Sequence, residues 1–366
     1  MIRIQNIGIF SFLLLAGLST GLLAFFDSGL KGIVLLSLGI ILGITFLFFQ
    51  YGFASGWRNL IVDKNPSMIS YHFLLATICS LFFIPLIGLN SGIIGSIAPV
   101  NLSLVIGALM FGFGMQLANG CGSGVLFTFG AGSGRMIIAL PFFIIGSVLG
   151  TYILPFVIDV MSLGQIVIGN DFPLFLKTLI NVSLLAFMFL IFQFFARKKK
   201  IQLNKKFLIG TVIIAILCIM VLFFSGSPWG VTYGFTLWGA KIFSALGIPV
   251  ENFTFWNWPG PKRSLEHSVL SDVSSMMNIG MIIGAGLLAS ITGLFSKSNW
   301  PPKAELISAA IGGILMGVGA RLSFGCNIGA FLGGTASGSL HGWIWFAMAF
   351  IGTYFGIIYR NKVGYK

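Results

Sequence analysis

Two of the four cysteines in this chain, Cys121 and Cys326, stand in the same short motif, Gly-Cys-x-x-Gly. A shift of 205 residues aligns residues 107–124 with residues 312–329 and gives seven identities in eighteen positions. A thiol is a soft group and a weak hydrogen-bond donor, and its reactivity depends on its pKa. We therefore expect the two thiols to form one paired site for a ligand that contains sulfur or selenium.

The glycines of the two motifs indicate how the backbone runs at these cysteines. Each apolar run breaks at its Gly-Cys pair, and glycine allows both sharp turns and close approach of helices. A helix that begins after such a turn points free N–H groups and a positive dipole end at its ligand, which favours an anion. The predicted site therefore includes the four motif glycines, Gly120, Gly124, Gly325 and Gly329.

Polar residues beside the motifs are further candidates for contacts with an anion. Arg321 is a charge inside an apolar segment, and such charges usually face a cavity or a partner. Gln116 occupies the equivalent place in the first copy, and Asn119 and Asn327 lie beside the two cysteines. These three amides could donate hydrogen bonds to an oxyanion.

Two more basic residues, Arg58 and Lys241, lie in other short segments of the chain. They could attract an anion toward the thiols, or they could simply extend to the membrane interface. The three histidines show no metal-ligand spacing, and no histidine or carboxylate lies near either cysteine motif in the sequence. The sequence thus predicts a binding site without a metal, a cofactor or catalytic residues. Cys79 and Cys218 lie in plain apolar segments, where we expect them to act as packing residues.

The composition requires a membrane for these elements. The chain is 57% hydrophobic and only 8% charged, whereas about 25% of the residues in soluble domains are charged. Ten apolar segments approach the roughly 20 residues that a helix needs to cross a bilayer, which predicts an all-α polytopic membrane protein. They are residues 7–26, 30–50, 68–88, 102–119, 136–160, 173–196, 206–224, 272–296, 303–322 and 341–359. Four shorter, glycine-interrupted pieces at about 52–62, 122–134, 229–247 and 326–338 are expected to be re-entrant segments or half-helices.

The net charge of +13 is explained by topology rather than by nucleic acid. With ten crossings and a cytoplasmic N-terminus, 15 of the 21 basic residues fall on the cytoplasmic side, including the cluster at 197–206. This is the bias that the positive-inside rule describes. We therefore predict that both termini are cytoplasmic. The aromatic loop at 253–261 is expected to lie in the membrane interface.

The order of long and short segments repeats along the chain. Residues 30–160 and 206–366 each follow the order long, short, long, long, short, long, and residues 1–29 add one further helix. Residues 161–205 form a linking helix and a basic cytoplasmic loop, so that the second unit enters the membrane from the opposite face. This predicts an inverted repeat, the arrangement common in transporters.

At these motifs the chain resembles the YeeE/YedE family of sulfur-transport membrane proteins. The resemblance rests on the two Gly-Cys-x-x-Gly motifs, on the SPWGVTYGF stretch at 227–235, on LWGAK at 237–241 and on MNIG at 277–280. It implies import of thiosulfate or a related sulfur compound across the bacterial inner membrane, with cysteines that pass the ion along by S–H···S contacts. It also implies a cytoplasmic sulfur-carrier protein of the TusA type as a partner. The family pattern has a cysteine in the first short segment, whereas Gly52-Phe53 is followed here by Ala54.

Other functions are compatible with the same residues. Relatives linked to selenium metabolism make a selenium compound an alternative substrate. A membrane sulfurtransferase or thiol oxidoreductase would use one cysteine covalently, but it would need a base that the neighbouring sequence lacks. A structural membrane subunit without a permeation path is the third alternative.

Overall fold

Each long apolar segment of the sequence forms a long helix in the computed structural model, which describes residues 5–201, 204–297 and 300–362. All ten expected segments contain a stretch that is long and apolar enough to cross a membrane, and the described residues contain no β-strand. The predicted all-α polytopic fold is therefore confirmed. The long helices are α1 (Ile7–Ser28), α2 (Leu30–Phe49), α4 (Ser67–Leu89), α5 (Leu102–Ala118), α7 (Gly134–Val157), α8 (Leu174–Lys198), α9 (Lys205–Ser225), α12 (Val273–Thr292), α13 (Lys303–Leu322) and α15 (Leu340–Lys362).

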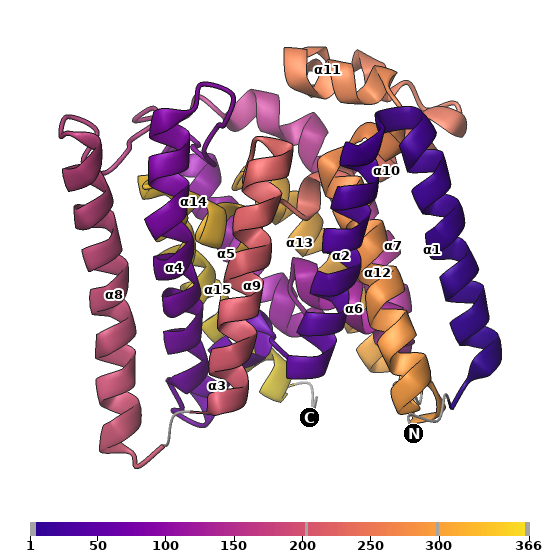
Figure 1. Ribbon diagram of the computed structural model, residues 1–366, viewed down its shortest axis with the longest axis horizontal. Helices are drawn as coiled ribbons and strands as arrows, with labels where there is room; N and C mark the ends of the chain where they lie inside the picture. The colour runs from indigo at the N-terminus through magenta and orange to yellow at the C-terminus, as the bar shows by residue number, and fades with distance from the viewer. Residues whose placement is uncertain (1–4, 202–203, 298–299, 363–366) are drawn as a thin grey trace.

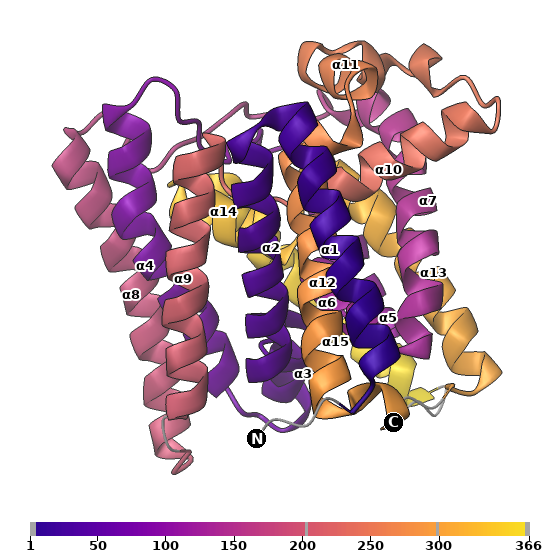
Figure 2. The same cartoon turned by 45° about the vertical axis from the view of Figure 1, so that its right-hand side comes forward.

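The four shorter pieces form short helices between the long ones. They are α3 (Phe53–Val62), α6 (Gly122–Gly130), α10 (Thr232–Ala245), and the π-helix η5 (Asn327–Leu332) with its continuation α14 (Gly333–Ala336). Figure 1 shows α3 and α6 in the lower half of the molecule and α10 and α14 in the upper half, and Figure 2 shows the same arrangement after a 45° turn. We refer to these two ends of the bundle as the lower face and the upper face.

The pairing of the long helices follows one scheme in both halves of the chain. Helix α2 packs against α12, and α4 packs against α9; α7 packs against α13, and α5 packs against α15. Helices α5 and α13 also pack against each other at the centre. If α2, α4, α5 and α7 correspond to α9, α12, α13 and α15, each pair maps onto its counterpart. This is the packing that two inverted units would produce.

Some helices of the bundle touch backbone to backbone. A Cβ atom added at Gly112 of α5 would lie 1.9 Å from the carbonyl oxygen of Ala349, and one added at Gly284 of α12 would lie 2.0 Å from that of Ile40. Only a residue without a side chain fits at such a crossing. Small residues at helix crossings are the usual way in which membrane helices approach closely.

The segment between α10 and α12 forms a series of short helices at the upper face. They are η1 (Val250–Asn252), η2 (Thr254–Asn257), α11 (Pro259–Glu266) and η3 (Val269–Ser271), while η4 (Leu294–Lys297) follows α12. In the aromatic loop, which we expect to lie in the membrane interface, Phe255 and Trp256 are only 5% and 1% exposed. The 3-10 turn of η2 folds these two rings against α7, where they join a buried cluster with Val148 and Leu322.

Candidate functional site

Each cysteine follows a turn that contains a left-handed residue at the same place. Helix α5 ends before Asn119, which has a left-handed φ of 62°, and α13 ends shortly before Phe324, which has a φ of 60°. These positions are equivalent under the 205-residue shift. Gly325 then adopts a φ of 153°, where a Cβ atom would lie 2.7 Å from the backbone nitrogen of Ala330. The turn therefore requires glycine immediately before Cys326.

Each cysteine is the N-cap of the short helix that follows it. The carbonyl of Cys121 accepts a hydrogen bond from Val125 N at 2.8 Å, and its Sγ accepts one from Gly124 N at 3.4 Å. The carbonyl of Cys326 accepts from the backbone nitrogens of Ala330 at 2.9 Å and Phe331 at 3.2 Å. Both thiols therefore lie at helix N-termini, where unpaired N–H groups and the positive end of the dipole favour an anion.

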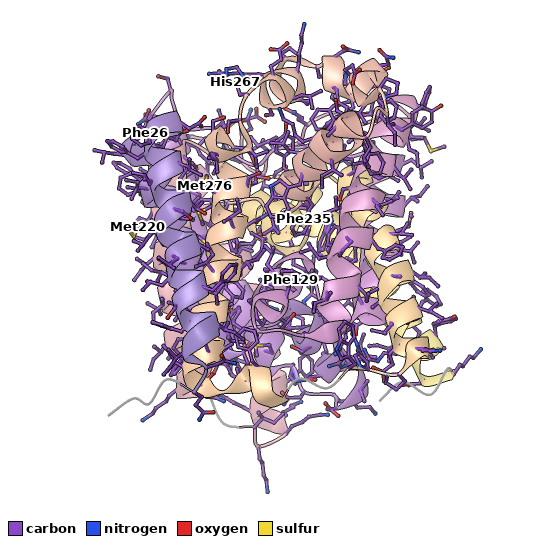
Figure 3. All side chains as sticks on the ribbon, turned by 90° about the vertical axis from the view of Figure 1, so that its right-hand side faces the viewer. Phe26, Phe129, Met220, Phe235, His267 and Met276 are labelled. Atoms are coloured by element: carbon purple, nitrogen blue, oxygen red, sulfur yellow. The ribbon has the colours of Figure 1, made fainter. Side chains whose placement is uncertain are left out.

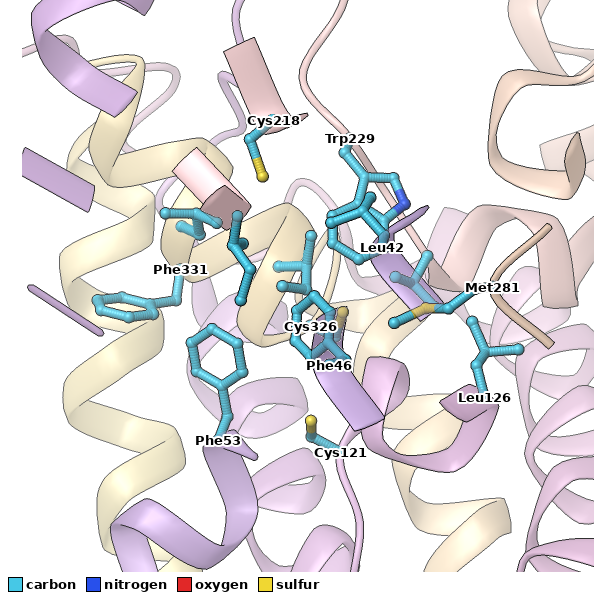
Figure 4. Close-up of a cluster of buried hydrophobic side chains, with 14 of the residues drawn as sticks. Leu42, Phe46, Phe53, Cys121, Leu126, Cys218, Trp229, Met281, Cys326 and Phe331 are labelled. Carbon is cyan, nitrogen blue, oxygen red and sulfur yellow. The ribbon is translucent and has the colours of Figure 1, made fainter. Parts of the chain in front are cut away.

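The two cysteine turns meet inside the protein. A Cβ atom added at Gly122 would lie 3.1 Å from Cys326 Sγ, so the glycine after the first cysteine directly faces the second thiol. Figure 4 shows Cys121 and Cys326 in one interior region, with Phe46 and Leu126 among the apolar side chains around them. Cys121 is 1% exposed and Cys326 is 0% exposed. The structure thus brings together the two thiols that the sequence paired, in a site closed to both faces.

Several buried polar atoms in the interior have no hydrogen-bond partner among the residues that the structure describes. Both amide atoms of Asn327, which directly follows Cys326, are unpartnered. Gln116 donates through Nε2 to the carbonyl of Ala54 at 3.1 Å, but its Oε1 is unpartnered. An unsatisfied buried polar group costs about 1–3 kcal/mol. Unpartnered groups in this interior therefore indicate a place for a polar ligand or water.

Asn278 and Trp229 are two interior residues that we did not single out from the sequence as ligand contacts. Asn278 Nδ2 donates to the carbonyl of Val231 at 2.8 Å, whereas its Oδ1 has no partner. The indole nitrogen of Trp229 is likewise unpartnered, and Figure 4 shows this ring near Cys326. Both residues belong to the stretches that carry the family resemblance, which was the available signal.

Arg321 lies in a different buried cluster from the cysteines. Its guanidinium carbon is 5.8 Å from the ring centre of Tyr233 and 5.5 Å from that of Phe255. The side chain is 9% exposed, and its Nε has no partner. Such aromatic contacts stabilise the cation. Lys241 donates from Nζ to the carbonyl of Leu265, in α11 at the upper face. These two basic residues thus lie toward the upper face rather than at the thiols.

A small polar cavity of about 230 Å³ opens beside this region, at the start of α12. Arg263, His267 and Asp272 are among its lining residues, and Figure 3 shows His267 at the top of the molecule, above Met276 of α12. Asp272 caps α12 by accepting a hydrogen bond from Ser275 N at 2.7 Å. Burial raises the pKa of the Asp272 carboxyl above its usual value.

Arg58 and Asn119 lie together at the lower face. Arg58 Nη1 donates to Asn119 Oδ1, and Arg360 Nη1 donates to the same oxygen at 3.1 Å. Asn119 also lines a cavity of about 560 Å³ with Gln50, Thr128, Ser133 and Arg135, and Arg135 is ion-paired with Glu305. From the sequence we expect Arg360 only to be one of the 15 basic residues on the cytoplasmic side. Nothing local in the sequence connects a residue near the end of α15 with the first cysteine motif.

The other predicted features lie outside this arrangement. Cys79 and Cys218 are buried in α4 and α9. Among the described residues, no group of three histidine, cysteine, aspartate or glutamate side chains could hold a metal ion. The interior therefore offers thiols, amides and helix N-termini, a combination suited to non-covalent contacts with a soft anion.

Comparisons with known proteins point to the same chemistry. A family model described as sulphur transport matches residues 50–355. The chain is 35% identical over 133 residues to the "Probable transporter YedE" of Escherichia coli, and 34% identical over 133 residues to that of Salmonella typhimurium. Each of these two matches covers 36% of this chain but only 32% of the relative. The chain is also 26% identical over 328 residues to the "Thiosulfate transporter TsuA" of Spirochaeta thermophila, a match that covers 84% of this chain and 93% of the relative.

Proposed function

Because this chain belongs to the sulphur transport family, we propose that it carries thiosulfate or a closely related small sulfur-containing anion across the bacterial inner membrane. The observation that carries the proposal is the meeting of the two cysteine turns, where Gly122 faces Cys326 Sγ. The relatives are named as transporters, and we propose binding and release without a covalent step. The name of the Spirochaeta thermophila relative supports thiosulfate as the substrate.

The proposed path runs through the closed thiol site. An anion that enters must give up much of its hydration, which is costly unless the protein supplies new donors. The S–H groups of Cys121 and Cys326 would contact the sulfur end, while the N–H groups that begin α6 and η5 and the amide of Asn327 would bind the oxygens. Soft thiols give weak hydrogen bonds, and weak contacts allow the ion to leave again.

The proposed orientation in the membrane rests on the charges at the two faces. Arg58 and Arg360 contact Asn119, which lines the lower cavity together with Arg135 and with Glu305 of α13. The last turn of α8 carries Arg197 and Lys198, and Figure 1 shows α8 and α9 joined at the lower face. The positive-inside rule then makes the lower face cytoplasmic. Arg321 and Lys241 would attract the anion at the opposite, outer face. With this orientation both termini are cytoplasmic.

We also propose the division into two inverted units, 30–160 and 206–366, with 1–29 as an extra helix and 161–205 as the link. The matching pairs of helices in the two halves support this division. A cytoplasmic sulfur-carrier protein of the TusA type, proposed as a partner, rests on the family resemblance alone.

Uptake of radiolabelled thiosulfate into proteoliposomes tests the function. Cys121→Ala and Cys326→Ala are each expected to remove at least about nine-tenths of the initial rate, since each loses one contact in the closed site. Such a tenfold change corresponds to about 1.4 kcal/mol in the transition state. Cys79→Ala and Cys218→Ala are the matched controls, because they remove buried thiols outside the two turns. Their rates should stay within about twofold of the wild type, since the loss of a packing thiol leaves the path unchanged.

The same vesicles, offered sulfite, sulfate and selenite, identify the preferred anion. Wild-type uptake by either Cys121→Ala or Cys326→Ala would refute the role of the thiols. A persulfide or thiosulfonate on Cys121 during turnover, detected by mass spectrometry, would instead support covalent chemistry.

A further inference from the structure

Two guanidinium groups from opposite ends of the chain meet at one neutral oxygen. Arg58 of α3 and Arg360 of α15 both donate through Nη1 to Oδ1 of Asn119. Arg360 is 5% exposed and also donates to the carbonyl of Gln116 at 3.0 Å. A cation of this kind is buried only where the surrounding structure holds it firmly. The arrangement is therefore a built feature of the lower face rather than a pair of surface side chains.

The shared acceptor is weaker than the one that these donors favour. Arginine binds carboxylates and other oxyanions through charge-assisted hydrogen bonds, which are about twice as strong as bonds to neutral groups. The amide oxygen of Asn119 carries no charge and lies between two like charges. A small doubly charged oxyanion that reached this point would therefore compete favourably with Asn119 for both arginines.

The position of Asn119 connects these arginines with the thiol site. Asn119 is exposed at the lower cavity, and Cys121, two residues further along the chain, is buried. Asn119 has a left-handed φ of 62° and thereby forms the turn that leads into Gly120 and Cys121. An anion that leaves the thiols toward the lower face thus meets this group at the boundary between the closed site and the open cavity.

Asn119 and Arg360 have no polar equivalent in the second repeat. The residue equivalent to Asn119 is Phe324, and the residue equivalent to Arg360 is Pro155. Asn119 and Phe324 nevertheless share the left-handed conformation, so the backbone geometry alone does not require the two arginines. The shared hydrogen bonding to Asn119 is therefore specific to the lower turn.

We propose that Arg58, Asn119 and Arg360 form an anion-operated latch at the release side of the path. The proposal rests on the proposed function. In the resting state Asn119 Oδ1 occupies both arginines and holds the turn before Cys121 closed. The departing anion replaces Asn119 as their acceptor, the turn is released, and the anion passes from the arginines into the lower cavity. The ligand class is a small sulfur-containing dianion.

Asn119→Asp is the decisive variant because it supplies a permanent carboxylate of the same shape. The carboxylate should hold both arginines by charge-assisted bonds, so the anion can no longer displace it. We expect thiosulfate uptake into proteoliposomes to fall at least about tenfold, a change equivalent to about 1.4 kcal/mol. The thermal unfolding midpoint of the detergent-solubilised variant should rise. Arg58→Gln and Arg360→Gln should each slow uptake by a similar factor, while Arg360→Lys should restore little, because lysine lacks the planar fork.

Lys303→Gln is the matched control, since it removes one exposed positive charge from the same face outside the latch. Uptake by this variant should stay within about twofold of the wild type, because screening weakens the effect of a distant exposed charge. An equal loss of uptake in Lys303→Gln would show that the arginines act only by general electrostatic attraction, which would overturn the latch. Wild-type uptake by Asn119→Asp would overturn the latch. If the wild type takes up no sulfur anion, the proposed function fails, and the thermal midpoint still decides the latch: an unchanged or lowered midpoint in Asn119→Asp overturns it.

Discussion

Gly122→Ala adds one methyl group at the point where the two cysteine turns meet. The new carbon would lie 3.1 Å from Cys326 Sγ, 3.5 Å from Cys326 Cβ and 3.6 Å from Thr232 Cγ2. Optimal contacts between carbon atoms lie at about 3.5–4.0 Å. The sulfur atom must therefore retreat by roughly half an ångström, in a region where Cys326 is 0% exposed. The substitution thus fills the space between the turns without removing a thiol.

The size of the effect follows from two opposing contributions. Overpacking a buried region costs about 1–3 kcal/mol, while alanine is up to about 1 kcal/mol more favourable than glycine in a helix. The free energy of unfolding should therefore fall by about 3 kcal/mol at most, and the variant should remain folded. If the anion must pass between Gly122 and Cys326, the same 1–3 kcal/mol raises its barrier. Uptake should then slow by a factor of about 5 to 150, since each 1.36 kcal/mol changes a rate tenfold.

The assay compares the initial rate of thiosulfate uptake with the thermal unfolding midpoint of the same preparation. Gly21→Ala in the peripheral helix α1 is the control, because the added carbon would make only an ordinary contact of 3.6 Å with Leu36 of α2. A folded Gly122→Ala protein with wild-type uptake would falsify the placement of the path between the two turns. A loss of uptake in Gly21→Ala would show that the assay responds to changes in helical glycines in general.

Three further predictions concern single residues. Asn327→Leu should raise the free energy of unfolding by about 1 kcal/mol or more, because it removes an unpartnered buried amide, yet it should slow uptake. Denaturant titration measures the stability and the proteoliposome assay measures the uptake. A loss of stability would contradict the prediction. Gly284→Ala should prevent the close packing of α2 and α12, since its carbon would lie 2.0 Å from a carbonyl oxygen, and size-exclusion chromatography should show little monodisperse protein. Burial raises the pKa of Asp272, so its contribution to stability is present at low pH and is lost as pH rises through the folded-state pKa. The thermal midpoint of Asp272→Asn should therefore fall less than that of the wild type between about pH 4 and pH 7, and identical slopes would contradict this.

The sequence by itself determined the elements and the central pair. Hydropathy located the ten long helices because a membrane helix must present about 20 apolar residues in a row, and this requirement is local. Glycine interruptions located the four short helices, because a break in an apolar run is also visible in the local sequence. The duplicated motif identified Cys121 and Cys326 as equivalent, and the structure brings their two turns together.

Only the tertiary structure decided which distant residues share a site. Gly122 faces Cys326, which is more than 200 residues away in the sequence. Arg58 and Arg360 converge on Asn119 from more than 60 and more than 200 residues away. Both arrangements depend on how distant helices pack. Arg321 lies only five residues from Cys326 in the sequence, but its side chain joins the aromatic cluster at the upper face. Residues that are close in the sequence can point to different sides of a helix and its turn. A site is formed by the side chains of different helices that pack against one another in the bundle.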